Sequence, residues 1–279
     1  MDRKNPVLVG EAKMRDALAG KIGRLKEQLA ALKKVAVAFS GGKDSFFMLK
    51  IAIDTLGQDN ALAFFARSDF LTENDQKRVD YFRRRFDLPV VELAIDPWPE
   101  EKIVSNPLDR CYHCKKKIFL AFREKASALG IAHLLDGTTH SDLDQYRPGL
   151  KALHELGILS PLKDVAITSG EVVEYLAAEL GIDDYFLTSS TCLATRFPYH
   201  HRLTREGLKT FAAIEGYFVD RGFYPVRIRY MEEGVRIEAA LPHFEKILEK
   251  RDEIIAFCKG LGIKFITLDL EGIKSGVWD

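Results

Sequence analysis

One short segment constrains this chain more than any other. An apolar run at residues 35–39 leads into Ser-Gly-Gly-Lys-Asp-Ser, and a helical apolar pattern follows it. We expect a buried strand, a tight glycine turn and a helix N-terminus. The first N–H groups of a helix lack partners within the helix and carry partial positive charge, which favours phosphate. The sequence therefore predicts a phosphate-binding loop made of Ser40, Gly41, Gly42, Lys43, Asp44 and Ser45.

The side chains of this loop suit a nucleotide triphosphate. The glycines allow close approach of the backbone, the serines donate hydroxyl groups, and Lys43 adds a cation. Asp44 is an acid among phosphates, which predicts that it holds Mg²⁺. The residue order matches neither the usual P-loop nor the dinucleotide fingerprint. The alternative interpretation is a plain glycine turn capped by serine.

Strand-like apolar runs alternate with helical patterns in the first part of the chain. The runs lie at 35–39, 61–66, 89–95 and 131–135, and the helical patterns at 44–56, 73–86 and 112–128. This alternation predicts right-handed crossovers and an α/β fold with a Rossmann-like, mostly parallel sheet. Ligands of such sheets bind beyond the carboxyl ends of the strands, where the glycine loop and residues 136–139 would lie.

The remainder of the chain reads differently. Residues 184–203 look like an irregular loop, and we place a domain boundary there, between 1–202 and 203–279. The second part predicts a small α+β module. Its elements are a helix at 204–220, strands at 224–230 and 235–240, a helix at 242–260 and a strand at 263–269.

Charge and hydropathy exclude several classes of protein. Lysine plus arginine equals aspartate plus glutamate at 41 each, so the chain lacks the basic bias of a dedicated nucleic-acid binder. No apolar run approaches the length of a membrane span. The first residues carry no apolar signal-peptide core, and we expect a cytoplasmic protein with no membrane partner.

The cysteines predict metal or redox chemistry rather than a disulfide framework. Cys111 and Cys114 form a C-x-x-C pair, Cys192 follows in the irregular loop, and Cys258 reads as a core thiol. Three thiolates can hold three irons of a [4Fe–4S] cluster and leave the fourth open. The alternatives are a zinc site with His113 as fourth ligand, a redox pair of the first two cysteines, or a lone nucleophile at Cys192.

Several further segments bear on the family of the chain. Together with the glycine loop they are residues 106–117, 135–142, 146–150, 160–162, 192–199, 226–229 and 268–272. In this order they resemble the LarE family of ATP-dependent sulfur transferases, in the PP-loop ATP pyrophosphatase superfamily. The resemblance covers nearly the whole chain. This chain departs from the family pattern at Pro198-Tyr199-His200, where many members have Pro-Tyr-Gly.

The resemblance implies an enzyme that forms AMP and pyrophosphate. ATP adenylates a carboxylate of a pyridinium dicarboxylate mononucleotide, and sulfur then displaces AMP in the synthesis of a nickel-pincer nucleotide. In one form of the family, the cysteine that matches Cys192 gives up its own sulfur. Members with three cysteines are similar to thiolases that carry a [4Fe–4S] cluster, and this chain resembles that branch. The implied cofactors are ATP, Mg²⁺ and the cluster.

The resemblance also assigns site residues. Gly137 and Arg147 join the ATP loop, and Cys192, Glu215 and Glu238 are catalytic candidates. Cys111, Cys114 and Cys192 are the cluster ligands. The substrate phosphate would bind Arg196, Arg227, Arg229 and Arg236, of which Arg227 and Arg229 alternate along a strand and share one face. The alternative is a solvated sheet face for the arginines and ordinary surface carboxylates for the two glutamates.

Two other functions remain open. A tRNA thiolase would share the ATP loop and the three cysteines, although the zero net charge disfavours it. A nucleotide-binding sensor with a redox cluster would release no pyrophosphate. We expect a small-molecule nucleotide substrate and a homo-oligomer, and the sequence does not identify the sulfur donor.

Overall fold

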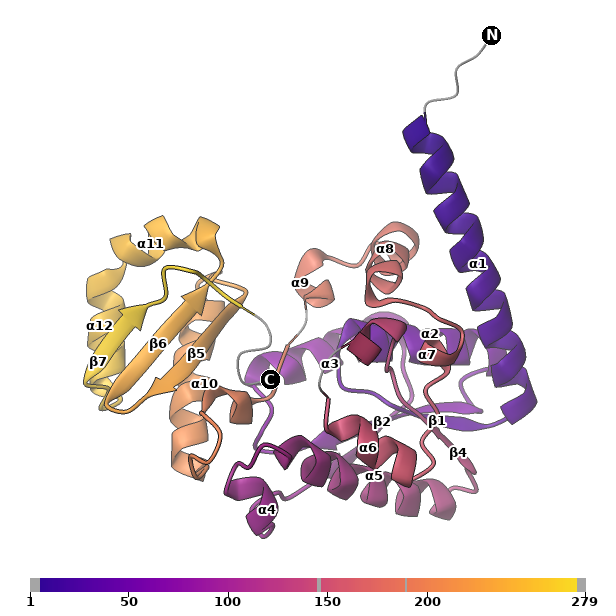
Figure 1. Ribbon diagram of the computed structural model, residues 1–279, viewed down its shortest axis with the longest axis horizontal. Helices are drawn as coiled ribbons and strands as arrows, with labels where there is room; N and C mark the ends of the chain where they lie inside the picture. The colour runs from indigo at the N-terminus through magenta and orange to yellow at the C-terminus, as the bar shows by residue number, and fades with distance from the viewer. Residues whose placement is uncertain (1–5, 145–146, 189, 275–279) are drawn as a thin grey trace.

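The computed structural model describes residues 6–144, 147–188 and 190–274, so Tyr146 and Ser189 of the segments discussed above lie outside the described residues. The chain forms a four-stranded parallel sheet and a smaller three-stranded mixed sheet (Figure 1). The predicted α/β fold with a small C-terminal α+β module is therefore confirmed.

The parallel sheet has the strand order β3-β2-β1-β4. Its strands are β1 (Val35–Ala38), β2 (Ala61–Arg67), β3 (Val90–Ala94) and β4 (His133–Leu135). β1 pairs with β2 on one side and with β4 on the other, so the strand order reverses beside β1. Ligands of open α/β sheets bind at such a reversal, beyond the carboxyl ends of the strands. The loops after β1 and β4 flank that position.

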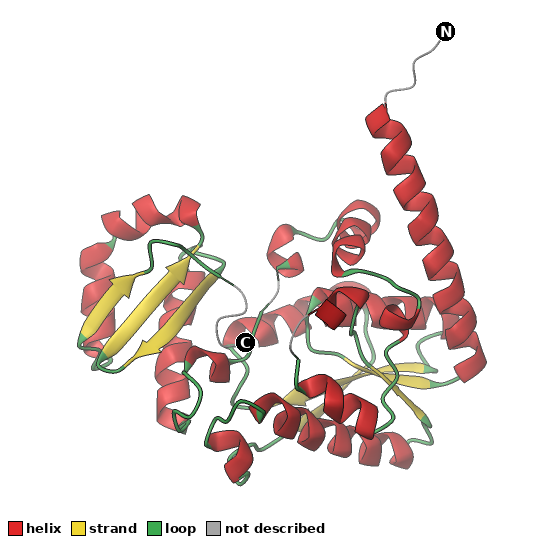
Figure 2. Ribbon diagram, viewed as in Figure 1, coloured by secondary structure: helices red, strands yellow, loops and turns green. Residues whose placement is uncertain are grey.

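Helices cover both faces of this sheet (Figure 2). One face packs against α1 (Pro6–Leu32), α2 (Lys43–Leu56), α3 (Glu73–Phe86) and α8 (Ser169–Leu180), and the other against α5 (Arg110–Ala128) and α6 (Gly149–Glu155). Along β1, Val35 and Val37 belong to the first core and Ala36 to the second. Strands that are buried on both faces explain the continuous apolar runs of the sequence.

The C-terminal module lies to one side of this domain, away from α1 (Figure 1). It contains α10 (Arg205–Val219), β5 (Val226–Met231), β6 (Gly234–Ala239), α11 (Phe244–Glu249), α12 (Arg251–Gly260) and β7 (Phe265–Leu268). Its core also includes Phe70, Ile103, Leu193 and Phe197, which precede the module in the sequence. The boundary at residue 203 stays a prediction, and residues on both sides of it share one core.

Two segments differ in detail from the sequence-based expectation. The segment at 184–203 contains two short helices, α9 (Asp184–Leu187) and the 3₁₀ helix η2 (Leu193–Arg196). The helix expected at 242–260 is divided into η3 (Leu241–His243), α11 and α12. The remaining short helices are α4 (Glu101–Val104), η1 (His140–Asp144) and α7 (Pro161–Asp164). Within the described residues, no helix combines the length and the apolar content of a membrane span.

Candidate functional site

The glycine loop connects β1 to α2, as the sequence predicts. Gly41 has a φ of +78°, and a Cβ there would lie 2.7 Å from Cγ2 of Val79 on α3. Both the backbone conformation and the packing therefore require glycine at this position. α2 begins within the loop, at Lys43, so the first N–H groups of the helix belong to the loop.

The two serines of the loop fix its shape. The Oγ atoms of Ser40 and Ser45 are 3.1 Å apart, and the Ser45 hydroxyl also donates to the carbonyl of Gly42 at 2.9 Å. A Cβ on Gly42 would lie 3.3 Å from Ser40 Oγ. Apart from the two residues next to Gly42 in the sequence, it would have no other neighbour within 4 Å among the described residues. The space beside position 42 is therefore limited by one side-chain oxygen and by no backbone atom of another described segment.

The Asp44 carboxylate lies between two donors. Lys43 Nζ is 3.1 Å from its Oδ2, and the Ser169 hydroxyl donates to its Oδ1 at 3.0 Å. Ser169 is the first residue of α8, so the N-termini of α2 and α8 meet at this carboxylate. Burial raises the pKa of Asp44, and the charge of Lys43 opposes that effect. An oxygen ligand so placed would suit Mg²⁺.

The loop after β4 touches the start of α2. A Cβ on Gly137 would lie 2.6 Å from the backbone nitrogen of Ser45, so the two loops are in direct contact because this residue is glycine. The preceding residue, Asp136, is buried and accepts hydrogen bonds from the hydroxyls of Ser160, at 2.7 Å, and Thr138. The structure thus brings Gly137 to the glycine loop and fixes it there.

Arg147 reaches the same region through an acidic neighbour. Its Nη2 lies 2.8 Å from Oδ1 of Asp142, and Oδ2 of Asp142 accepts from the backbone N–H of Thr139 at 2.8 Å. The Asp142 charge also contributes to the raised pKa of Asp44. The predicted ATP-binding residues therefore gather at the carboxyl ends of β1 and β4.

The three candidate ligand cysteines come together from two distant parts of the chain. Cys111 and Cys114 lie at the start of α5, and Cys192 immediately precedes η2. Burial, followed by the charges of Cys192 and Cys111, raises the pKa of Cys114 to about 12. Burial also raises the pKa of Cys192. Cys258 is a buried thiol in the core of the C-terminal module, as the sequence predicts.

The fit of these thiols to a metal is mixed. Within the described residues, no group of three or more His, Cys, Asp or Glu side chains has the geometry to hold a metal ion. The donor set does suit iron–sulfur chemistry, because three soft thiols lie near one another. A cluster would require the thiols to lose their protons, which metal coordination drives. The [4Fe–4S] cluster therefore stays a proposal.

Arg110, to which our sequence analysis gives no role, links the cysteines. Its Nη2 donates to Cys111 Sγ at 3.4 Å, and its Nη1 donates to the carbonyl of Ala194 at 3.2 Å. The same Nη1 donates to the Asn106 side chain. The guanidinium thus joins α5 to the loop that carries Cys192. The one sequence signal is its place directly before the C-x-x-C pair.

Arg196 and Glu215 form a buried two-point ion pair. The Nε and Nη2 atoms of Arg196 both contact the carboxylate, the latter at 3.0 Å. Glu215, on α10, also accepts from the backbone N–H of Ile228 on β5 at 2.9 Å. The pair therefore connects η2, α10 and β5. The sequence predicts both residues at the site, and the structure brings them together as partners of each other.

Arg229 and Glu238 form a second buried pair. Nε of Arg229 donates to Oε2 of Glu238 at 3.0 Å, and its Nη1 donates to the carbonyl of Thr195 at 2.6 Å. The other carboxylate oxygen accepts from Arg236 at 2.8 Å. This network ties β5 and β6 to the turn that follows Cys192. Thr195 therefore contributes to the site through its backbone, which residue type alone does not reveal.

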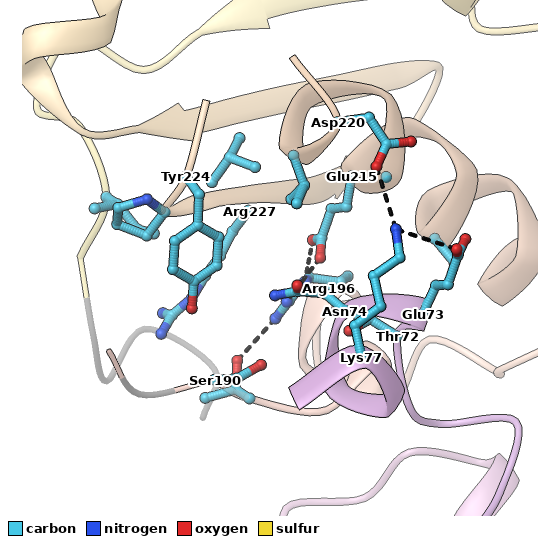
Figure 3. Close-up of a pocket in the computed structure, with 17 residues that line it drawn as sticks. Thr72, Glu73, Asn74, Lys77, Ser190, Arg196, Glu215, Asp220, Tyr224 and Arg227 are labelled. Atoms are coloured by element: carbon cyan, nitrogen blue, oxygen red, sulfur yellow. Dashed lines mark hydrogen bonds and ion pairs between the residues drawn. The ribbon is translucent and has the colours of Figure 1, made fainter. Parts of the chain in front are cut away.

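A pocket opens where α3, α10 and β5 meet (Figure 3). Of the four arginines predicted to bind phosphate, Arg196 and Arg227 line it; Arg229 and Arg236 are not among its described lining residues. Arg227 Nη1 donates to the carbonyl of Lys274 at 2.8 Å. Lys77 lies on the α3 side and pairs with Glu73 and with Asp220 of the opposite wall (Figure 3).

Comparisons with known proteins extend this description. The chain is 34% identical over 259 residues to the pyridinium-3,5-bisthiocarboxylic acid mononucleotide synthase of Lactiplantibacillus plantarum, with 93% of this chain and 94% of that protein covered. An uncharacterised protein of Synechocystis sp. is 32% identical over 265 residues, with 93% and 97% covered. One of Methanocaldococcus jannaschii is 30% identical over 243 residues, with 87% and 92% covered. No family model matches the chain.

Fold and site together define a Rossmann-like α/β protein with a glycine loop at the reversal of strand order and three cysteines near a small C-terminal module. The similarity to the Lactiplantibacillus plantarum synthase runs along nearly the whole of both chains. The chain belongs to the LarE family, and the resemblance found in the sequence is confirmed.

Proposed function

We propose that this chain is an ATP-dependent sulfur transferase that converts a carboxylate of a pyridinium dicarboxylate mononucleotide to a thiocarboxylate. The observation that carries the proposal is the full-length similarity to a synthase of pyridinium-3,5-bisthiocarboxylic acid mononucleotide, at 34% identity. The loops at the carboxyl ends of β1 and β4 and the grouped cysteines support it, because the reaction needs both a nucleotide site and a sulfur site.

The first step activates the substrate. A carboxylate oxygen attacks the α-phosphorus of ATP, the bond to the β-phosphate oxygen breaks, and pyrophosphate leaves. The N–H groups at the start of α2 and the cation of Lys43 would bind the phosphates. Asp44 would hold Mg²⁺, which neutralises phosphate charge when it is bound. Ser169 orients the Asp44 carboxylate by its hydrogen bond of 3.0 Å.

The second step replaces AMP with sulfur. A sulfur nucleophile attacks the carbonyl carbon of the acyl adenylate, and the bond to the AMP oxygen breaks. By one route Cys111, Cys114 and Cys192 would hold a [4Fe–4S] cluster, which would supply the sulfur when bound. By the other, the Cys192 thiolate displaces AMP to form a thioester. A base then removes the Cα proton of Cys192, and its Cβ–S bond breaks, which leaves the thiocarboxylate and dehydroalanine. We favour the first route, because a cysteine that is itself consumed needs no C-x-x-C partner, whereas this chain groups Cys192 with Cys111 and Cys114.

The pocket between α3, α10 and β5 is the proposed site of the substrate phosphate. Arg227 and Arg196 line it, and the turn that contains Cys192 ends at Arg196. Guanidinium groups bind phosphate oxygens through charge-assisted hydrogen bonds. Because Glu215 already pairs with Arg196, its role in this proposal is to hold that side chain rather than to transfer a proton.

The test is an anaerobic reaction with ATP, Mg²⁺, sulfide and pyridinium-3,5-dicarboxylic acid mononucleotide. We expect AMP, pyrophosphate and a product whose mass rises by the difference between sulfur and oxygen for each carboxylate converted. Asp44→Ala should form no acyl adenylate, and hence no pyrophosphate. Formation of AMP and pyrophosphate without any sulfur-containing product would refute the transfer.

Intact-protein mass spectrometry after turnover separates the two routes. Loss of the mass of H₂S, mapped to Cys192, would establish donation from the cysteine. An unchanged protein mass with sulfur-containing product would support the cluster. Under the cluster route, Cys111→Ala and Cys114→Ala should abolish product, whereas Cys258→Ala should not.

A further inference from the structure

Arg110 is a cation without an evident counter-ion. It is 1% exposed, and among the described residues its hydrogen bonds go to a carbonyl, an amide side chain and a thiol. The other buried arginines near the cysteines are different, because Arg196 is paired with Glu215 and Arg229 with Glu238. No carboxylate of the described residues forms such a pair with Arg110.

One side of this guanidinium faces sulfur. Its Nη2 lies 3.4 Å from Cys111 Sγ. Its Nη1 is held by Asn106 and by the carbonyl of Ala194 at 3.2 Å. The Nη1 atom of the guanidinium is therefore held by the protein, and the Nη2 atom is directed at the Cys111 thiol.

A buried charge is strongly unfavourable unless a charge of opposite sign lies close to it. Neutral partners satisfy the N–H groups of Arg110 but do not compensate its charge. Of its hydrogen-bond partners among the described residues, the one that can become negative is the Cys111 thiol. The structure would therefore be most favourable when the cysteine site itself carries negative charge.

We propose that Arg110 is the counter-ion of an anionic sulfur centre formed by Cys111, Cys114 and Cys192. Arg110 also positions Cys111 against η2, the short helix that directly follows Cys192. The inference rests on the three-cysteine site of the proposed function. Three thiolates around one divalent metal ion carry a net charge of minus one, which a single guanidinium offsets. Arg110 is thus a positioning residue, which acts through the cysteines.

Co²⁺ alone is a suitable probe, because thiolate ligands give this ion a charge-transfer band in the near ultraviolet. The full chain, reduced and anaerobic, is titrated with Co²⁺ and the band is followed. We expect the parent protein to form the band and Arg110→Gln to bind Co²⁺ at least about tenfold more weakly, because a charge-assisted contact is lost. Arg110→Lys keeps the charge and should bind within about threefold of the parent.

The matched control removes the charge of another arginine, which has no contact with a cysteine among the described residues. Arg202 is exposed and pairs with Glu101 at 2.6 Å, so Arg202→Gln should leave the Co²⁺ titration unchanged. Far-ultraviolet circular dichroism and the melting temperature identify variants that fold. If Arg110→Gln does not fold, Arg110→Lys carries the test, and a tenfold loss of affinity in the folded Lys variant would overturn the counter-ion role.

Two other results would also overturn the proposal. Equal Co²⁺ affinity in folded Arg110→Gln and parent protein would show that the charge has no effect on the sulfur centre. A parent protein without any thiolate band would show that the three cysteines form no such centre. In either case, formation of thiolated nucleotide by the same preparation would leave the proposed sulfur transfer in place.

Discussion

At the scale of single residues, Gly137 and Gly42 differ in how closely the protein surrounds them. A Cβ at position 137 would lie 2.6 Å from the backbone of Ser45, whereas one at position 42 has its nearest neighbour at 3.3 Å, a side-chain oxygen. The first site is filled by backbone atoms of the protein, whereas the second has one close neighbour, a side-chain oxygen. Substitutions at the two positions should therefore have different effects.

We expect Gly42→Ala to keep the stability of the parent and to lose ATP-dependent pyrophosphate release, because its Cβ occupies the proposed phosphate space. Gly137→Ala should lose both, with a fall of about 1–3 kcal/mol in the free energy of unfolding from overpacking. Urea denaturation and a pyrophosphate assay measure the two effects. Gly20→Ala in α1, where a Cβ meets nothing within 4 Å, is the control.

His201 predicts a dependence of stability on pH. Its ring stacks on Phe197 and lies 4.1 Å from that of Tyr230, and burial lowers its pKa. The unfolded chain therefore takes up a proton at this residue before the folded protein does. Stability should be complete above the usual histidine pKa of about 6.5 and should fall as the pH drops below it.

The measurement is the melting temperature between about pH 7.5 and 5. His201→Phe keeps an aromatic ring in place and should reduce the fall in melting temperature on acidification. His154→Gln, at an exposed position, is the control and should follow the parent. An unaltered pH dependence in His201→Phe would show that other groups cause the fall.

At the scale of elements, the sequence predicts best where one period or one turn decides the structure. The strand and helix on either side of the glycine loop are predicted to within one residue, because apolar runs and the glycine turn bound them. The helix expected at 242–260 is divided at Lys250, a change that its apolar pattern does not signal. η2 also escapes prediction, because tertiary contacts such as the hydrogen bond from Leu193 to the carbonyl of Phe70, at 2.9 Å, define it.

The pair between η2 and α10 predicts a structural role for Glu215. Replacing one partner of a buried ion pair leaves the other charge unpaired, so Glu215→Gln should lower the free energy of unfolding by about 3–5 kcal/mol. Urea denaturation measures the loss. Asp252→Asn, in the exposed pair with Arg251, should have no comparable effect. If Glu215→Gln keeps the parental stability and loses only turnover, the glutamate acts on the substrate and our assignment is wrong.

At the scale of the whole molecule, the sequence lists most of the residues in the candidate site but not their mutual arrangement. The spacing of Cys111, Cys114 and Cys192 indicates a shared site, and the fold brings them near one another. That Arg196 pairs with Glu215 depends on how α10 packs against η2, which no local pattern encodes. Arg110 shows the same limit, because its partners lie up to 84 residues away.

The shared core predicts one cooperative unit rather than two independent domains. Leu193 and Phe197 precede residue 203 and are buried among residues of the C-terminal module, so a cut there exposes apolar surface on both fragments. We expect the full chain to give one calorimetric transition whose van't Hoff and calorimetric enthalpies agree. Residues 1–202 expressed alone should bind a hydrophobic dye and melt below the full chain. Two resolved transitions in the full chain, together with a fragment that melts at the temperature of one of them, would instead establish separate domains and show that the Cys192 turn is stable without the module.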